Sequence, residues 1–521
     1  MRPDLFACLL FYDVIFIATR GVASEQPVDT SHGLKPMLNG PIANFKQKIV
    51  HLDLKGAPLS VPYMVKIFPM LREMNVTGLL IEYEDMFPYS GPLTNLSAKN
   101  HYSEADIGRI LEGARSNSLT VVPLIQTFGH LEFSLKLAEN IGLREQRVSP
   151  DVLCPSFNAS VDMVREMLRQ VVNLHRGHIT HLHIGCDEVY SLGLCSRCLK
   201  RMFVNHWTRS DLFLDHVYTV ASTVKEFGLQ PIMWDDMLRK IDLGTLLKYK
   251  RLTSLVEIMV WSYGCQIPAE TTLAMRKYEF LHVPAVWFAS AFKGGSGPTN
   301  QMPKYRLHLS NHIAWSVEAK RLEGKLNIAG IAITGWQRVD HFSSLCELFP
   351  VGLPVLSLCM AYLNTGSYNA TVLAEIQKRL KCNRPLPLDD VPSPPLLACS
   401  YPGSDVLVGV QQFNQILLKR QIIENDNIYQ GWMTAMNEKH NFSSPRHLGE
   451  IAAKIGPMLK LLASVHNNMR QLSNITDAAT WREWMETFLW PQVDWTITLK
   501  RNTDRLISQS SWPRRPLYDE L

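Results

Sequence analysis

Eight short apolar runs follow one another between residues 46 and 340, and this repeat constrains the fold more than any other feature of the sequence. Each run is rich in Val, Ile or Leu and is separated from the next by a longer segment with helical periodicity. Such alternation is typical of parallel strands joined by crossover helices, and eight units predict a (β/α)8 TIM barrel in the α/β class. A doubly wound open sheet is the alternative, but no G-x-G-x-x-G follows the first run. The runs are residues 49–56, 77–85, 119–130, 181–188, 230–237, 256–263, 283–294 and 329–338.

The segments between the runs carry the marks of amphipathic helices. Ser103 and Asp106 have the spacing of a capping box, which starts a helix. Apolar residues then recur at helical spacing, and they do so again in segment 161–174, so both segments are predicted crossover helices. The apolar positions are Ile107, Ile110, Leu111 and Ala114 in the first segment and Val164, Met167, Leu168 and Val171 in the second.

The chain of 521 residues is longer than a barrel domain of ~250 residues requires. We expect the barrel over residues 46–365, a proline-rich strap or linker over 366–403, and a helical region over 404–521 that packs against the barrel or forms a homodimer. A hydrophobic fraction of 46% with 19% charged residues indicates a globular protein. A net charge of +5 without a basic stripe argues against nucleic acid as a partner.

The first 24 residues resemble a secretory signal peptide, with an early Arg, an apolar stretch and small residues at its end. Residues 25–45 are expected to be a leader or linker. We therefore expect the ER lumen, a lysosome or the extracellular space; a disordered or mitochondrial-type leader, with a cytoplasmic or nuclear protein, is the alternative. Six N-x-[ST] tripeptides fit a glycoprotein, and the C-terminal YDEL is similar to ER-retention signals. No later segment offers the ~18 apolar residues of a membrane span.

Removal of the leader would leave nine cysteines, so at least one is unpaired or joins another chain. Cys195 and Cys198 form a C-x-x-C that fits a redox pair, half of a metal site or a local disulfide. No second C-x-x-C and no downstream H-x(3–5)-H supplies the other half of a zinc site. The sequence therefore predicts neither a metal nor another cofactor.

Polar and aromatic residues gather at the C-terminal end of every run. In a (β/α)8 barrel these ends meet on one face, where active sites are built. Aromatic rings stack on the C–H faces of sugars, and carboxylates and amides bind hydroxyl groups, so this face is predicted to bind a carbohydrate. The residues are Asp53, Lys55, Glu82, Glu84, Asp85, Gln126, His130, Asp187, Glu188, Trp234, Asp235, Asp236, Trp261, Tyr263, Trp287, Lys293, Trp336, Gln337 and Arg338.

Asp187 and Glu188 are adjacent in HLHIGCDEVY, residues 181–190. Most glycosidases hold two carboxyls ~5–9.5 Å apart on opposite sides of the sugar, which neighbouring residues do not readily do. The pair does suit a 2-acetamido sugar whose own acetamide oxygen attacks the anomeric carbon, because one carboxyl protonates the departing oxygen and the other orients the acetamide N–H. We expect the charge of Asp187 and a dry pocket to raise the pKa of Glu188 and keep it protonated.

HLHIGCDEVY resembles the H-x-G-G-D-E motif of family 20 β-N-acetylhexosaminidases. The similarity extends through IEYEDMFPY, QTFGH, WDDM, ASAFKG and TGWQR, over residues 46–365. The resemblance implies a TIM barrel that removes terminal β-linked GalNAc or GlcNAc from a glycan or glycoconjugate by substrate assistance, without a metal.

The resemblance also implies roles for single residues. Glu188 matches the general acid/base, Asp187 the residue that orients the acetamide, and His130 the histidine of the family's P-G-H. Trp234, Trp261 and Trp336 match the walls of the acetamide pocket. The other expected substrate-binding residues are Asp53, Glu82, Asp236, Tyr263 and Trp287.

The sequence departs from the family pattern at three places. Cys186 replaces the second glycine of the motif, Phe288 the tyrosine near the seventh strand end, and Arg338 the glutamate of W-x-E after the eighth strand. Tyr263 is our candidate for the missing tyrosine hydroxyl. The lost glutamate leaves the choice between GalNAc and GlcNAc open.

Two other functions stay open at this point. The departures fit a catalytically silent sugar-binding barrel. Two distant carboxylates, such as Glu188 and Glu82, fit a glycosidase that does not need the N-acetyl group.

Overall fold

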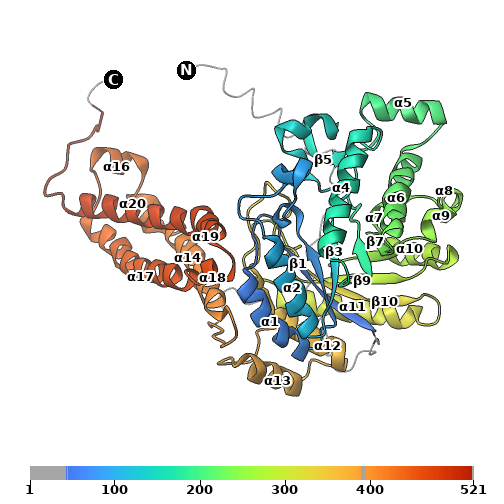
Figure 1. Ribbon diagram of the computed structural model, residues 1–521. Helices are drawn as coiled ribbons and strands as arrows, with labels where there is room; N and C mark the ends of the chain where they lie inside the picture. The colour runs from blue at the N-terminus through green and yellow to red at the C-terminus, as the bar shows by residue number, and fades with distance from the viewer. Residues whose placement is uncertain (1–42, 44, 389–394, 519–521) are drawn as a thin grey trace. The chain divides into compact units, whose positions relative to one another are not determined.

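Eight parallel strands close into a barrel in the order β1-β10-β9-β8-β7-β6-β3-β2 (Figure 1). One strand overlaps each of the eight predicted runs, so the prediction of a (β/α)8 barrel is confirmed. The strands are β1 (Gln47–Asp53), β2 (Gly78–Glu82), β3 (Thr120–Leu124), β6 (His181–His183), β7 (Gln230–Trp234), β8 (Glu257–Trp261), β9 (Val286–Lys293) and β10 (Ile328–Gly335).

The structure is a computed structural model that describes residues 43, 45–388 and 395–518. The predicted signal peptide and the last three residues of the YDEL ending lie outside these residues. Within them, no helix is both long enough and apolar enough to cross a membrane.

Amphipathic helices cover the outside of the barrel. Helix α2 begins with the predicted capping box, since Ser103 accepts a hydrogen bond from the backbone of Asp106 and Asp106 accepts one in return. The predicted apolar stripes of α2 and α4 are buried, which confirms both helices. The helices between the strands are α1 (Val61–Glu73), α2 (Glu104–Ser116), α4 (Asn158–Leu174), α6 (Arg209–Glu226), α7 (Asp236–Lys240), α8 (Leu243–Lys248), α9 (Lys250–Thr253), α10 (Ala269–Phe280) and α11 (Tyr305–Leu322); α12 (Phe349–Thr365) follows the last strand.

Additional elements extend the loops after β2, β3 and β6. The loop after β2 contains the 3-10 turns η2 (Glu84–Met86) and η3 (Gly91–Leu96). After β3 come α3 (Glu132–Leu135), η4 (Ala138–Leu143) and a hairpin of β4 (Arg144–Gln146) and β5 (Ser149–Leu153). Helix α5 (Ser196–Asn205) follows β6. These loops emerge at the C-terminal ends of the strands.

The C-terminal region is helical, as predicted. Helix α13 (Ala370–Leu380) precedes a proline-rich segment that a disulfide between Cys382 and Cys399 closes. The region contacts the barrel, because Trp484 Nε1 donates a 2.9 Å hydrogen bond to Gln301 Oε1. Its helices are α14 (Ser404–Glu424), α15 (Asn427–Trp432), α16 (Ala435–His440), α17 (Pro445–Met469), α18 (Leu472–Ile475), α19 (Ala478–Trp484), the π-helix η5 (Met485–Leu489) and α20 (Trp490–Ile507).

Gly294 lets the loops after β9 and β10 approach closely. Its φ is 72°, and an added Cβ would lie 2.5 Å from the Cβ and 2.7 Å from the carbonyl oxygen of Trp336. The next residue, Gly295, has a similar φ of 75°, but its added Cβ would meet Tyr263 Cδ2 only at an ordinary 3.4 Å. The position of Trp336 therefore depends on glycine at 294.

Gly294→Ala is expected to lower the free energy of unfolding by about 1–3 kcal/mol more than Gly295→Ala. Both substitutions place a Cβ at a positive φ, which costs about 1–2 kcal/mol in each case. The difference between them therefore isolates the clash with Trp336. Urea denaturation of the two variants measures it, and equal losses would contradict the close approach.

Candidate functional site

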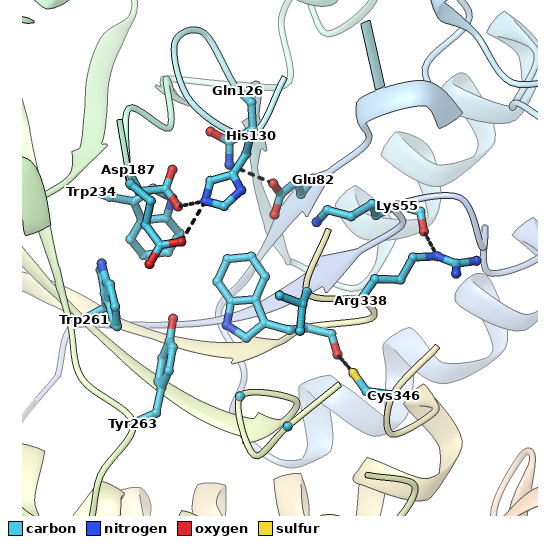
Figure 2. A pocket seen from close by; sticks show the side chains of 15 residues that line it. Lys55, Glu82, Gln126, His130, Asp187, Trp234, Trp261, Tyr263, Arg338 and Cys346 are labelled. Carbon is cyan, nitrogen blue, oxygen red and sulfur yellow. Dashed lines mark hydrogen bonds and ion pairs between the residues drawn. The ribbon is translucent and has the colours of Figure 1, made fainter. Parts of the chain in front are cut away.

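A pocket opens at the C-terminal ends of the barrel strands (Figure 2). Its volume of about 230 Å³ is below the ~300–1,000 Å³ of pockets for drug-sized ligands, so it has room for one sugar ring rather than an extended chain. Eight of the eleven predicted site residues line it: Glu82, His130, Asp187, Glu188, Trp234, Trp261, Tyr263 and Trp336. The barrel prediction placed the site at this end.

One nitrogen of the His130 imidazole contacts both adjacent carboxylates (Figure 2). Its Nε2 is 3.3 Å from Asp187 Oδ2 and 3.3 Å from Glu188 Oε2. Glu188 exposes 41% of its side chain and Asp187 only 11%. Glu188 therefore faces the open part of the pocket, whereas Asp187 lies deeper.

His130, Asp187 and Glu188 form a triad, and the interactions of His130 determine where its protons reside. Burial alone would lower the pKa of His130, but the charge of Asp187 and hydrogen bonds to both carboxylates raise it well above its ordinary value. The hydrogen bond from His130 lowers the pKa of Glu188, although burial acts in the opposite direction. The expectation of a raised pKa for Glu188 is therefore wrong for the free protein, because the imidazolium that contacts both carboxylates offsets their repulsion.

The two loops that carry the triad approach each other through their backbones. A Cβ on Gly129 would lie 2.3 Å from the carbonyl oxygen of Asp187, so only glycine permits this approach. His130, Cys186 and Glu188 adopt left-handed φ angles of 51°, 68° and 49°, which cost a residue with a Cβ about 1–2 kcal/mol each. This strain is typical of functional sites, and it explains why H-x-G-G-D-E has a glycine where this chain has Cys186.

Asp236, a predicted site residue, lies behind the acidic pair and does not line the pocket. Its Oδ2 accepts a 3.0 Å hydrogen bond from the backbone N–H of Glu188, and its Oδ1 accepts a 3.4 Å hydrogen bond from Trp261 Nε1. Burial, followed by the charge of Asp187, raises the pKa of Asp236 to about 7. Asp236 therefore positions two pocket residues.

Four aromatic side chains form one wall of the pocket. The ring centroids of Trp234 and Trp336 are 6.1 Å apart, Trp261 stacks on Tyr263 at 5.3 Å, and Tyr263 is 6.5 Å from Trp336. Within the described chain, the indole N–H groups of Trp234 and Trp336 and the Oδ1 of Asp187 are buried without a hydrogen-bond partner. Because native proteins rarely leave buried polar atoms unpaired, these atoms are suited to bind a polar ligand.

Charged and amide side chains form the opposite wall (Figure 2). Glu82 Oε1 accepts a 3.0 Å hydrogen bond from Gln126 Nε2, and its Oε2 lies 3.0 Å from His51 Nε2. Burial favours the neutral form of Glu82, but Lys55 and His51 together lower its pKa well below the ordinary value. This wall therefore presents a fixed carboxylate to the pocket.

Asp53 lies outside the pocket and holds Lys55 at its edge. Its Oδ1 is 3.2 Å from Lys55 Nζ, and its Oδ2 accepts a 2.7 Å hydrogen bond from the backbone N–H of Gln337. Burial alone would lower the pKa of Lys55, but Asp53 and Glu84 raise it well above its ordinary value. Lys55 is therefore a cation in the pocket wall.

Trp287 lies at the other end of the barrel, which corrects its predicted place in the pocket. Strand β9 starts at Val286, so Trp287 lies near the beginning of the strand and points into the barrel core. Its Nε1 donates a 2.7 Å hydrogen bond to Oε2 of Glu257, the first residue of β8. The apolar run 283–294 did not reveal where within it the strand begins.

The pocket also contains residues outside the eleven predicted catalytic and substrate-binding residues. Lys55, Gln126 and Arg338 were already among the polar residues expected at the strand ends, although no individual role was predicted for them. Cys346 carried no such signal, yet its Sγ donates a 3.1 Å hydrogen bond to the carbonyl oxygen of Trp336. The other lining residues are Gly295, Gly297 and Val339.

A group of side chains that could hold a metal ion lies outside the pocket in the described part of the chain. It consists of Glu145, Cys154, Cys195 and Cys198, and it is separate from the triad.

Comparison with known proteins gives concordant matches. Residues 64–339 match the model of "Glycosyl hydrolase family 20, catalytic domain". Hexosaminidase D of Homo sapiens is 37% identical over 483 residues, which cover 91% of this chain and 98% of that protein. Hexosaminidase D of Bos taurus is 42% identical over 336 residues, which cover 64% of this chain and 96% of that protein.

Asp236→Asn is expected to change the pH dependence of stability. Because the pKa of about 7 lies above the value of ~3.9 in an unfolded chain, the folded protein binds the extra proton between these limits. The stabilisation from that proton is present at low pH and is lost as pH rises toward 7. The free energy of unfolding of the wild type relative to Asp236→Asn should therefore fall between pH 4.5 and 7, by up to about 1.4 kcal/mol per pH unit.

Urea denaturation across this pH range measures the difference. Asp242→Asn is the matched control, because Thr245 and neighbouring backbone groups lower the pKa of Asp242, so that it titrates below this range. A wild-type minus Asp236→Asn difference that is constant with pH would contradict the raised pKa.

Proposed function

Because the chain belongs to glycosyl hydrolase family 20 and is a glycoside hydrolase of the β-N-acetylhexosaminidase type, we propose that it releases terminal β-linked N-acetylhexosamine from glycans with retention of configuration. The observation that carries this proposal is the contact of His130 Nε2 with both Asp187 and Glu188, beside an aromatic wall. A pocket with room for one ring supports removal of single terminal residues.

Glu188 acts as the general acid and then as the general base. The acetamide oxygen of the substrate attacks the anomeric carbon, the bond to the departing oxygen breaks, and Glu188 gives that oxygen its proton. In the second step Glu188 takes a proton from water, which opens the cyclised acetamide at the anomeric carbon. Two inversions give net retention. The exposure of Glu188 toward the open pocket supports this role.

Asp187 orients the acetamide. Its buried Oδ1 has no hydrogen-bond partner within the described residues, so it is available to accept from the acetamide N–H. As a carboxylate, it stabilises the positive charge that develops on the acetamide during cyclisation. The neighbouring rings of Trp234, Trp261 and Trp336 enclose the methyl group, and the hydroxyl of Tyr263 can donate to the acetamide oxygen.

His130 stores the proton that Glu188 needs. In the free enzyme the proton resides on the imidazole, because the pKa of His130 is raised and that of Glu188 is lowered. A sugar over the pocket excludes water and disfavours the charged pair. The proton then moves from Nε2 of His130 to Oε2 of Glu188, 3.3 Å away.

The charged wall binds the ring hydroxyls. Glu82 accepts hydrogen bonds, whereas Lys55 and Arg338 donate them. Arg338 occupies the position of the family's W-x-E glutamate, and Lys55 and Glu82 line the same pocket. These three residues therefore determine the preference between GalNAc and GlcNAc, which differ only in the orientation of one hydroxyl.

Glu188→Gln and Asp187→Asn are each expected to lower kcat by ~10²–10⁴-fold on nitrophenyl β-GalNAc and β-GlcNAc. Neither the wild type nor a variant should cleave the β-galactoside, because it lacks the acetamide nucleophile. Initial rates on the three substrates measure this, and the wild-type rates identify the preferred sugar. Asp242→Asn, an exposed acid outside the pocket, is the control and should keep wild-type rates.

Dinitrophenyl glycosides separate the two roles, because this leaving group needs no proton. Glu188→Gln should release a burst of dinitrophenolate and then turn over slowly, while Asp187→Asn should show no burst. Cleavage of the β-galactoside that is lost in Glu82→Gln would instead support two distant carboxylates. A folded wild type without turnover from pH 4 to 7 would support a silent binding barrel.

His130→Asn is expected to move the alkaline limb of the kcat/KM profile to lower pH. In the wild type the last proton of the His130–Glu188 pair leaves with a pKa well above 6.5, so activity persists at neutral pH. In the variant this proton resides on Glu188 alone, whose ordinary pKa is ~4.3. At pH 7 kcat/KM should therefore fall at least ~10-fold further than at pH 5.

Steady-state rates from pH 4 to 8.5 measure the profile. The exposed His178 offers a matched control, because His178→Asn removes an imidazole outside the pocket. An alkaline limb that stays in place in His130→Asn would refute proton storage by His130.

A further inference from the structure

Three thiols and one carboxylate converge beside the barrel, outside the pocket. Cys154 Sγ lies 3.4 Å from Cys195 Sγ and 3.7 Å from Cys198 Sγ, and Cys198 Sγ lies 3.0 Å from Glu145 Oε2. The four donor atoms are all within 4.8 Å of one another. Glu145, Cys154 and Cys198 are buried, and Cys195 is partly exposed.

This geometry matches a closed tetrahedral zinc site. Zinc binds thiolates at ~2.3 Å, which separates two ligands at the tetrahedral angle by ~3.8 Å. The observed sulfur separations of 3.4 and 3.7 Å are close to that distance. Three soft sulfur ligands and a fourth protein ligand favour a structural zinc over a hard cation such as Mg²⁺ or Ca²⁺.

The carboxylate is already oriented for a ligand. Glu145 Oε1 accepts hydrogen bonds of 2.6 Å from Leu194 N and 2.9 Å from Cys195 N, which leaves Oε2 directed at the thiols. Such outer hydrogen bonds fix the direction of metal ligands.

A disulfide between two of these cysteines would explain the arrangement less completely than a zinc ion does. A bond between any two of the three cysteines would leave the third thiol and the buried Glu145 without a role. Cys382 and Cys399 form a disulfide in the same structure, whereas these three are free thiols.

We propose that Glu145, Cys154, Cys195 and Cys198 bind one structural Zn²⁺, which joins the loop after β3 to the loop after β6. Glu145 lies in β4, and Cys154 directly follows β5. Cys195 is the N-cap of helix α5, and Cys198 lies in its first turn.

The proposed zinc site lies on the two loops that carry the triad. Leu153, beside Cys154, donates a 3.1 Å hydrogen bond to the carbonyl of Phe128, two residues before His130. Cys195 follows Glu188 by seven residues in the loop after β6. The metal therefore fixes His130 relative to Glu188. Metal binding does not depend on the proposed function, whereas the effect on catalysis does.

The test is zinc analysis of the full-length protein, produced with zinc available and then dialysed. The wild type should hold about one zinc per chain. Cys198→Ser and Glu145→Gln should each lose most of it, while Cys265→Ser, at an exposed cysteine outside the site, should keep it. Wild-type protein without zinc, or with Cys154 and Cys195 joined in a disulfide by mass spectrometry, would overturn the proposal.

A second measurement uses the wild-type protein and therefore does not depend on the folding of a variant. A mercurial reagent that caps thiols should release the zinc from the wild type, as followed with a colorimetric zinc indicator. Cobalt in place of zinc should give the intense near-ultraviolet absorption of a thiolate complex. Zinc that stays bound after the thiols are capped, or cobalt without that band, would exclude these ligands.

The positioning role has its own readout. Zinc removal by a chelator should lower kcat at least ~10-fold with a smaller change in KM, and added zinc should restore it. Cys265→Ser should respond as the wild type does. Folded, zinc-free enzyme with wild-type kcat would show that the metal does not position the triad, while the zinc content would still report on the site itself.

Discussion

The contacts of His130 with Asp187 and Glu188 hold the site together. Two carboxylates one peptide bond apart repel each other, and the repulsion grows in a buried pocket because the low dielectric screens it less. An imidazolium 3.3 Å from both carboxylates offsets that repulsion. The close approach at Gly129 and the left-handed backbone of His130 and Glu188 are the geometric cost of this arrangement.

Residues outside the pocket fix those inside it. Asp236 accepts hydrogen bonds from the backbone N–H of Glu188 and from the indole N–H of Trp261. On the opposite wall, Asp53 forms an ion pair with Lys55 and so fixes its position. Asp236 and Asp53 therefore each accept a hydrogen bond from a residue at a neighbouring strand end. A barrel suits this arrangement because its closed sheet brings eight strand ends to one rim.

The C-terminal helices also reach the pocket. Arg338, a lining residue, forms a bidentate ion pair with Glu483 of helix α19, with both N–O distances 2.5 Å. The same guanidinium donates to the carbonyl of Lys55 at 3.1 Å. Arg338 thereby connects the helical region to the charged wall of the pocket.

The sequence alone determined the barrel, the crossover helices and most of the pocket. Strands repeat every 2.0 residues and helices every 3.6 residues, and both periods are visible in a short stretch of sequence. Once eight strands and their helices are predicted, the barrel topology places the C-terminal ends of all eight strands on one rim. Asp187 and Glu188 could be assigned to the pocket from the sequence because they directly follow a predicted strand. The pocket walls could be predicted because aromatic and acidic residues recur at the C-terminal ends of the other predicted strands.

Only the tertiary structure decided the remaining features, because each depends on contacts between distant segments. The direction of the pKa shift of Glu188 follows from His130, which lies in another loop. The place of Trp287 depends on where β9 begins, which is set by pairing with β8 and β10. The C-x-x-C at Cys195 lies beside Glu145 and Cys154, which precede it by 41 or more residues, a separation that no local spacing rule covers.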